Sequence, residues 1–387
     1  MAAGQHPGMA VIDPPGDLVL NLAAGGIPAG REQDAWLLEL GDPEWPLDLS
    51  PFWAPPGVPK EVVAQVVYSV FRLLFQEQWS PTRMADAVFS LVATLCSLPG
   101  ATLLDAARLL NDPLFRRRAL SHVDDPATLE FWQEYEALSD AARREMARPV
   151  LYRLRALYRS PAVRNLLCQS RGLDFLELMD QGAILLVSLA GQAIQAEADL
   201  LGELLISQIH LAALARLSQR REDRRPFYLL ADESQRFQGA SAPILLREGR
   251  KLGVTLILLS QYLEAWSAEL SEAILGNVGT LVVFRCSPND SHRLGAALKP
   301  FTPEDLEDLA RFEAVAKLQV AGETMPAFDF RLPGLQAIAP RDEAALARIR
   351  ARTRQRFARP RREVEEEIHP AQRPRDEGWE GMDVDEE

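Results

Sequence analysis

The chain has 387 residues and a mass of 43.0 kDa, and 47% apolar with 25% charged residues is an ordinary globular composition. A chain of this length can bury a large core, which excludes a disulfide-stabilised mini-protein, a collagen-like chain and a wholly disordered chain. The formal net charge of −13 at pH 7 argues against non-specific DNA binding through overall charge.

The cysteines and histidines form no recognisable site. Cys96, Cys168 and Cys286 lie far apart and outside any CxxC pair, which excludes a zinc knuckle and a disulfide framework. The five histidines are equally scattered. A reducing cytosol is therefore the expected compartment. We find no run of about 18 apolar residues and no signal peptide, so we expect no membrane segment in this chain.

Residues 1–55 are predicted to form a strand, a loop and a second strand. The apolar run Met9–Ile12 ends at an Asp-Pro-Pro-Gly sequence, because proline cannot continue a strand ladder. A second apolar run, Trp36–Leu38, is followed by a proline-rich segment. Asp13 thus lies at the end of a strand, where it is either a site residue or an ordinary strand-to-turn junction.

Residues 56–181 show helical periodicity throughout and no strand pattern. Apolar residues recur at helical spacing in 60–76 and 80–98. Several shorter helices follow, separated by Asn-Asp-Pro, Asp-Asp-Pro and Ser-Pro sequences. We interpret this region as an inserted all-α domain.

Strands and helices alternate over residues 182–333. Continuous apolar strands are predicted at 182–190, 227–233, 254–260 and 280–284. Such strands, alternating with helices, indicate an α/β fold whose parallel sheet is covered on both faces. The segments 312–322 and 325–332 are predicted to form a terminal hairpin.

The C-terminal residues divide by charge. An Arg-rich helix is predicted within 334–362, since Arg341–Arg362 holds nine arginines and two acids. Glu363–Glu387 holds 11 acids and two arginines, so residues 363–387 are predicted to be a disordered acidic tail. The Arg-rich helix is either a nucleic-acid-binding element or a solvated surface helix.

The strongest chemical signal is the segment FYLLADESQRF, residues 227–237. Its apolar strand runs directly into Asp232 and Glu233. At this position in nucleotide-hydrolysing α/β proteins, the first acid holds Mg²⁺, usually through water, and the second polarises the attacking water. The alternative is a strand that merely ends in two acids.

Other strand ends carry polar residues that suit the same chemistry. Gln261 ends the next strand, at the edge where open parallel sheets bind ligands, and suits contact with a γ-phosphate or water. Arg285 follows the last strand, and Arg250 lies on the helix before the strand of Gln261. An arginine of this kind can act on a neighbouring subunit's phosphate. A polar strand end and a solvated helix face are the alternatives, and for Arg247 the solvated face is the better interpretation.

The ordered set of segments has a counterpart in a known family. In chain order they are VIDPPGDL, the long helical insertion, GAILLVSLAGQ, FYLLADESQRF, REGRKLGVTLILLSQYL and LGNVGTLVVFR. Over roughly residues 8–331 they resemble the RecA-like motor domain of type IV secretion coupling proteins of the TraG/TraD kind, and their HerA/FtsK-type relatives. The resemblance implies a RecA-like sheet of the P-loop-NTPase type with an inserted all-α domain, in a hexameric ATP-driven DNA translocase.

The resemblance also implies roles for individual residues. Asp232 and Glu233 match the Walker B pair, with Asp232 holding Mg²⁺ through water and Asp13 beside the Mg-ATP. Gln261 matches the sensor, and Arg250 or Arg285 the trans-acting arginine. The implied cofactors are Mg²⁺ and ATP. The implied partners are DNA, further copies of the chain, and relaxosome or secretion-channel proteins, in the cytoplasm or at the cytoplasmic face of the inner membrane.

One essential motif of such motors is missing. The phosphate loop GxxxxGK[ST] cradles phosphates with its backbone amides and a lysine, and this chain has no Gly-Lys pair at all. In the family that loop precedes the strand of VIDPPGDL by about one helix, and Pro15 stands where the family often has lysine. Three explanations are open: a truncated form, which we favour, a degenerate paralogue that no longer hydrolyses ATP, or a loop borrowed from a partner chain.

Two functions therefore compete. The first is a coupling ATPase subunit that translocates DNA. The alternative is a catalytically inactive module that docks a protein or nucleic-acid partner through the all-α domain and the charged C-terminal region. We expect the chain alone to be poorly soluble, because loss of a strand and helix exposes apolar surface on the remaining sheet.

Overall fold

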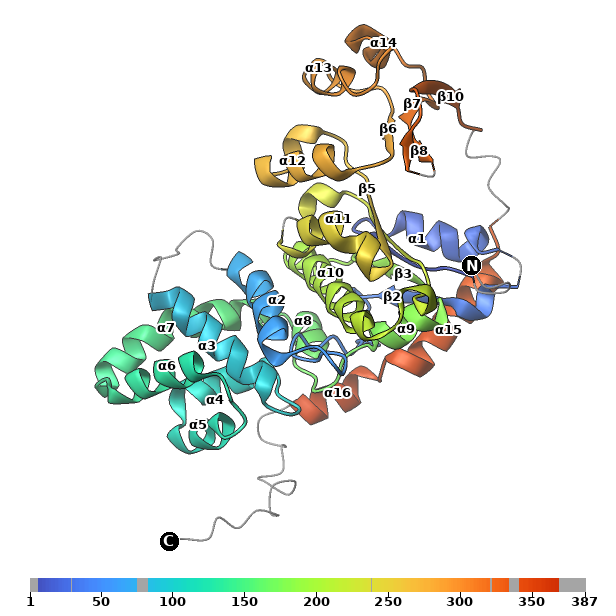
Figure 1. Cartoon of the computed structure of the whole chain (residues 1–387). Helices are drawn as coiled ribbons and strands as arrows, with labels where there is room; N and C mark the ends of the chain where they lie inside the picture. The colour runs from blue at the N-terminus through green and yellow to red at the C-terminus, as the bar shows by residue number, and fades with distance from the viewer. Residues whose placement is uncertain are drawn as a thin grey trace.

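The computed structural model describes residues 6–28, 30–74, 83–237, 239–320, 322–333 and 341–368 (Figure 1). At its centre is a five-stranded parallel sheet in the order β2-β3-β1-β4-β5. The strands are β1 (Gly8–Asp13), β2 (Ala35–Glu39), β3 (Ile184–Ser188), β4 (Phe227–Ala231) and β5 (Val254–Leu258). The predicted α/β fold with a parallel sheet is confirmed.

Helices cover both faces of this sheet, and each face has its own core. On the face to which Val11 points, here the Val11 face, lie α1 (Asp17–Asn21), a π-helical turn (Leu22–Gly26) and α15 (Glu343–Phe357). On the opposite face, the Ile12 face, lie α9 (Phe175–Gln181), α10 (Ala198–Ala215) and α11 (Ser241–Leu252). The division follows from the alternation of side chains along each strand.

The region between β2 and β3 is helical, as predicted. Its helices before α9 are α2 (Lys60–Leu73), α3 (Arg83–Ser97), α4 (Asp105–Asn111), α5 (Pro113–Leu120), α6 (Pro126–Ala137), α7 (Asp140–Leu157) and α8 (Pro161–Leu167). Trp132 is fully buried among them and donates a hydrogen bond to Thr94 Oγ1 at 2.8 Å. Because α2 packs on α10, this helical core is continuous with that of the Ile12 face. Its status as a domain of its own stays a prediction.

The long helix α10 is buried rather than amphipathic. In the part of the chain that the structure describes, one helix, Ala198–Ser218, is long and apolar enough to cross a membrane by length and composition. Of its qualifying window, 83% is buried inside the fold. The helices α2, α9 and α11 pack around it, and a helix surrounded in this way is apolar on all sides.

The prediction that residues 280–284 continue the parallel sheet is wrong. Instead β6 (Leu281–Val283) pairs antiparallel with β7 (Glu313–Lys317), which pairs with β10 (Phe328–Arg331) and so confirms the terminal hairpin. The remaining elements here are α12 (Ala268–Asn277), α13 (Pro288–Gly295), α14 (Pro303–Glu307), β8 (Gln319–Val320) and β9 (Glu323–Thr324). Residues 281–331 form a small lobe beyond α12 (Figure 1). An apolar strand pattern does not specify which strand it pairs with.

The Arg-rich segment forms two helices, α15 and α16 (Arg361–Ile368). The predicted start of the disordered tail at Glu363 is therefore wrong, because α16 continues past it. Val364 and Ile368 are buried, and ion pairs at i,i+4 spacing link the arginines to the acids of this helix. The rest of the predicted tail lies outside the described residues.

Candidate functional site

The sheet topology brings the predicted acids together at the carboxyl edge of the sheet. β1 ends at Asp13, and its neighbour β4 is followed by Asp232 and Glu233. The backbone N–H of Asp232 donates to the carbonyl of Ile12 at 2.9 Å. Asp13 and Asp232 therefore lie next to each other where β1 and β4 end.

Asp13 is the most deeply buried of these carboxylates, with an exposed fraction of 1%. Its Oδ2 accepts the N–H of Val19 at 3.1 Å, which ties α1 to the end of β1. Its Oδ1 has no hydrogen-bond partner among the described residues. A buried oxygen without a donor is costly, and a cation or its bound water would satisfy it.

Asp232 is half-buried beside two other acids. Desolvation raises its pKa, the Glu233 N–H donated to Oδ1 at 3.0 Å opposes that rise, and the negative charges of Asp13 and Glu233 add to it. No lysine or arginine of the described chain forms an ion pair with any of the three carboxylates. This excess negative charge is what a divalent cation offsets.

Glu233 is held in an uncommon backbone conformation. Its φ of 44° and ψ of 44° lie in the left-handed region of backbone conformation, which residues other than glycine rarely adopt. Gln261 donates to its Oε1 and Gln235 to its Oε2, so the carboxylate is fixed by two side-chain amides. The structure thus joins the predicted sensor glutamine to the second predicted Walker B acid.

The predicted arginines do not reach this edge in the structure. Arg250 is exposed in the last turn of α11, which runs back to the amino edge where Gly253 leads into β5. Arg247 is exposed on the same helix. Arg285 is exposed after β6, in the small lobe. Their action on a neighbouring subunit stays a prediction.

Sequence reasoning missed Glu203, a buried acid on α10. Its Oε2 accepts the N–H of Gly239 at 3.1 Å, while Oε1 has no partner in the described structure. Burial raises its pKa to about 7. Beside it, a Cβ on Gly202 would lie 2.2 Å from the ring of Phe237. α10 therefore anchors the loop that follows Glu233, and the only sequence signal was an acid within an apolar run.

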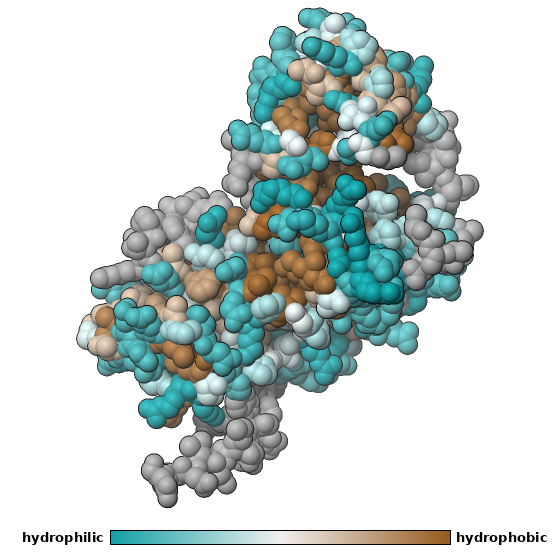
Figure 2. All heavy atoms as spheres, viewed as in Figure 1, coloured by the Kyte–Doolittle hydropathy of each residue, from teal (hydrophilic) through white to brown (hydrophobic). Residues whose placement is uncertain are grey.

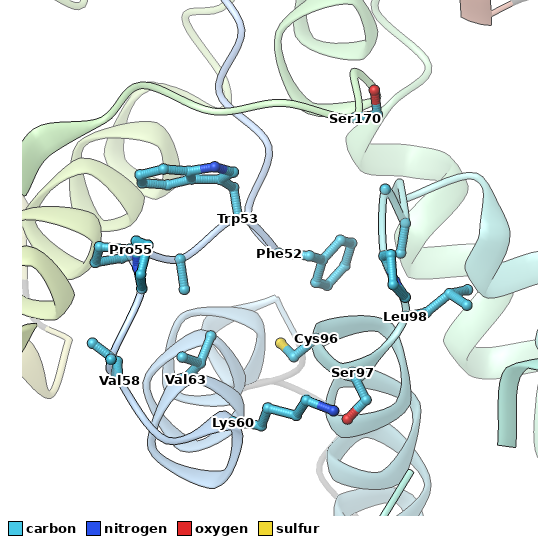
Figure 3. Close-up of a pocket in the computed structure, with 16 residues that line it drawn as sticks. Phe52, Trp53, Pro55, Val58, Lys60, Val63, Cys96, Ser97, Leu98 and Ser170 are labelled. Carbon is cyan, nitrogen blue, oxygen red and sulfur yellow. The ribbon is translucent and has the colours of Figure 1, made fainter. Parts of the chain in front are cut away.

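A cavity of about 330 Å³ lies elsewhere, between the loop before α2 and the end of α3 (Figure 3). Phe52, Trp53 and Cys96 line it, and burial raises the pKa of the Cys96 thiol. The amine of Lys60 at its rim donates to the carbonyl of His122 at 3.3 Å. None of the clustered carboxylates lines this cavity, so it is no part of the candidate site.

The residues at the carboxyl edge fit a magnesium ion better than they fit nucleotide phosphates. Mg²⁺ keeps several waters and needs only one or two carboxylates, which Asp13 and Asp232 supply. The described residues contain no cluster of three or more His, Cys, Asp or Glu side chains suited to direct metal binding. Arg236, the cation nearest to them in sequence, donates to Asp199 at 2.6 Å and is not free for a phosphate.

The parallel sheet, with acids at the ends of adjacent strands, fits the RecA-like α/β fold of the P-loop-NTPase type. The chain is similar in fold to the plasmid coupling protein TrwB in complex with ADP and Mg²⁺, with a TM-score of 0.59 and 14% identity over 87% of this chain and 81% of that one. The unbound monoclinic form of TrwBdeltaN70 gives a TM-score of 0.58 and 16% identity over 87% and 80%. VirB4 of Thermoanaerobacter pseudethanolicus gives 0.52 and 14% over 85% and 82%. The fold predicted from the resemblance to TraG/TraD-type coupling ATPases is confirmed.

Two comparisons by sequence found no match. No protein-family model matches the chain, and no curated protein matches it.

Proposed function

We propose that this chain is the motor body of a type IV secretion coupling ATPase that translocates DNA. The observation that carries the proposal is the convergence of Asp13, Asp232, Glu233 and Gln261 at one edge of a RecA-like sheet. The similarity to TrwB, a conjugative coupling protein solved with ADP and Mg²⁺, supports it. Mg²⁺, when bound, supplies charge stabilisation to phosphoryl oxygens.

Each residue of the site has a distinct task in this proposal. Asp232 would hold the hydrated ion, and the unpartnered Oδ1 of Asp13 would accept a hydrogen bond from a water bound to that ion. Glu233 orients the attacking water and accepts its proton, since two side-chain amides fix its carboxylate. Gln261 links that carboxylate to the end of β5.

The phosphate loop is the missing component. We propose that the 387 residues are a truncated form and that the loop belongs to a segment outside them. The assembled motor is then a hexamer that binds DNA and contacts relaxosome or secretion-channel proteins, in the cytoplasm or at the cytoplasmic face of the inner membrane. Arg250 or Arg285 serves the site of the neighbouring subunit.

The alternative of an inactive docking module is not favoured by the Arg-rich segment. Arg350 makes a two-pronged contact with Glu39, at 2.6 and 2.8 Å. Arg354 donates to Asp42 at 2.6 Å. Because these guanidinium groups bind acids of the same chain, they are not free for the phosphates of a nucleic acid.

The test uses the polypeptide extended by an in-frame phosphate loop. We expect ATP hydrolysis that DNA stimulates, and a Glu233→Gln variant whose turnover falls at least about 100-fold while nucleotide binding is retained, as for loss of a general base. Glu222→Gln, an exposed acid before β4, is the matched control and should keep the parental rate. Parental turnover by the Glu233→Gln variant would overturn the Walker B assignment.

A further inference from the structure

Helix α7 of the helical region carries an exposed row of arginines. Residues 140–159 hold six arginines and two acids, in a chain whose formal net charge is −13. The buried side of the helix packs on α3 and α4. The exposed residues on its other side are Arg144, Arg148, Tyr152, Arg155 and, just past its end, Arg159. Their spacings of three and four residues place them in one row, which we call the α7 face.

The charges of the α7 face are not balanced within the described part of the chain. Its four arginines make no ion pair with a carboxylate of the described residues, and Arg155 has a hydrogen bond to the Tyr158 hydroxyl instead. Arg143, on the flank of the same helix, does pair with Asp140. The arginines of α15 likewise bind acids of the chain, as Arg350 does. The α7 face is therefore a local excess of positive charge on an acidic protein.

An aromatic side chain lies in the middle of the α7 face. Tyr152 is 65% exposed, with Arg148 one turn before it and Arg155 one turn after it. An exposed ring flanked by guanidinium groups suits an anionic partner that also carries aromatic or apolar groups. Hydrophobic side chains gather elsewhere, between the main body and the small lobe (Figure 2). The α7 face is thus distinguished by its charge and not by its apolar area.

The chain contains a segment of the opposite charge. Residues 376–387, here the acidic segment, hold seven acids and no basic residue, together with Trp379, Met382 and Val384. Blocks of like charge commonly act as interaction tails. The acids are opposite in sign to the arginines of the α7 face, and the apolar residues suit contact with Tyr152.

The last described helix packs on the helix that follows α7. α16 lies on α8, where Asn165 donates to Glu365 Oε1 at 3.2 Å. Residues 369–387 can extend about 60 Å at about 3.3 Å per residue, whereas α7 and α8 together are about 38 Å long at 1.5 Å per residue. The acidic segment can therefore reach the whole α7 face, at the effective concentration in the millimolar range that a short linker gives. A free nucleic acid has no such linker, which favours the acidic segment as the occupant.

We propose that the acidic segment docks on the α7 face of its own chain. Its carboxylates pair with the four arginines, and its apolar side chains contact Tyr152. Because exposed ion pairs are individually weak, the contact depends on their number and on the salt concentration. The docked segment covers the α7 face, so another anionic ligand must displace it to bind there. This contact does not rest on the proposed nucleotide chemistry.

The test measures proteolysis of the acidic segment in the 387-residue chain. Glutamyl endopeptidase cleaves after Glu377 and Glu380, and intact mass spectrometry follows the loss of the segment. A docked segment is cleaved only through opening, so Arg148→Glu combined with Arg155→Glu should accelerate this cleavage at least about tenfold. In about 1 M salt, where the screening length is about 3 Å, the parent should be cleaved as fast as this variant.

Two control variants separate the α7 face from overall charge. Arg221→Glu combined with Arg247→Glu makes the same change of charge at exposed positions elsewhere and should keep the parental cleavage rate. Arg148→Lys combined with Arg155→Lys keeps the positive charge and should also keep that rate. If the glutamate variant of the α7 face does not fold, Arg144→Gln combined with Arg159→Gln repeats the test.

Each outcome decides the proposal. Equal cleavage of the parent and the α7-face variant would overturn it, as would equal acceleration by the control at positions 221 and 247. Protection that grows with protein concentration would assign the acidic segment to a second copy. A labelled single-stranded oligonucleotide that binds the parent but not the α7-face variant, with cleavage unchanged, would assign the face to nucleic acid. ATP hydrolysis does not enter the measurement, so failure here leaves the proposed function untouched.

Discussion

At the scale of single residues, the site is built from groups that stability alone does not favour. Glu233 occupies a left-handed backbone conformation, and Asp13 keeps a buried oxygen without a donor among the described residues. Asp232 lies beside both, with a raised pKa. Strain and uncompensated charge concentrated at one point are typical of functional sites, where chemistry and not folding selects the residue.

Substitution of Glu233 can separate the backbone cost from the chemistry. Glycine has no Cβ and occupies the left-handed region freely, so Glu233→Gly should be about 1 kcal/mol more stable than Glu233→Ala. Both variants lack the carboxylate, which makes them a matched pair. Urea midpoints at constant slope measure the difference. An alanine variant as stable as the glycine variant would show that this position is not strained.

Glu203 should give the protein a stability that depends on pH. Burial raises its pKa to about 7 in the folded state, against about 4.3 for an unfolded chain, so between these values the folded state binds the extra proton. The free energy of unfolding therefore falls as pH rises through this window. Glu203→Gln removes the fall and keeps an oxygen to accept the Gly239 N–H, so the variant should gain about 3 kcal/mol on the parent at pH 8.

Urea unfolding at pH 5 and pH 8 checks this expectation for Glu203. Asp48, with a pKa raised to about 7 by burial, and His210, with a pKa lowered to about 4 by burial, also affect stability with pH. They are present in both proteins, so the difference between parent and variant isolates Glu203. An equal gain at both pH values would contradict a raised pKa.

At the scale of elements, α15 acts as the cover of the β2 edge. Three of its arginines pair with acids within residues 32–42, as Arg348 does with Glu32 at 2.7 Å. Arg352 and Arg356 also lie over the ring of Trp36, at 5.2 and 4.9 Å from its centroid. The Arg-rich composition is thus explained by contacts within the chain.

Substitution of Thr353 tests whether α15 protects the β2 edge. Thr353 is buried, and Thr353→Val keeps its shape but leaves the Leu37 N–H unpaired, which should cost about 1–3 kcal/mol. Amide exchange at Leu37 should accelerate in that variant. Thr353→Ser retains the hydroxyl and should keep the amide protected. Equal exchange rates in the two variants would mean that the hydroxyl does not protect this edge.

The sequence predicted those parts of the site that depend on local pattern. Asp13, Asp232 and Gln261 were predicted because parallel strands end at one edge, so each strand end identifies a neighbour of the others. The contact between Glu203 and Gly239 was missed because it joins a helix to a loop. Helical or strand periodicity in the sequence gives no information about such a contact. The prediction that residues 280–284 belong to the parallel sheet was wrong for the same reason, since strand pairing is a tertiary property.

At the scale of the whole molecule, the chain has separate apolar cores. The core of the Ile12 face runs from the main sheet into the helical region. The small lobe has its own, which includes Leu298 and Val315, and it shares no residue with the first. Among the described residues, β5 and β6 are outer strands of two separate sheets, so no strand pairing joins the two cores. Separate cores unfold as separate cooperative units.

Calorimetry of the 387-residue chain should therefore show two unfolding transitions. Leu298→Ala removes a fully buried side chain of the small lobe, at a typical cost of about 2–5 kcal/mol, and should lower or abolish only the smaller transition. Leu205→Ala makes the same change in the core of the Ile12 face and should lower only the larger one. A single transition shifted by both variants would show one cooperative unit.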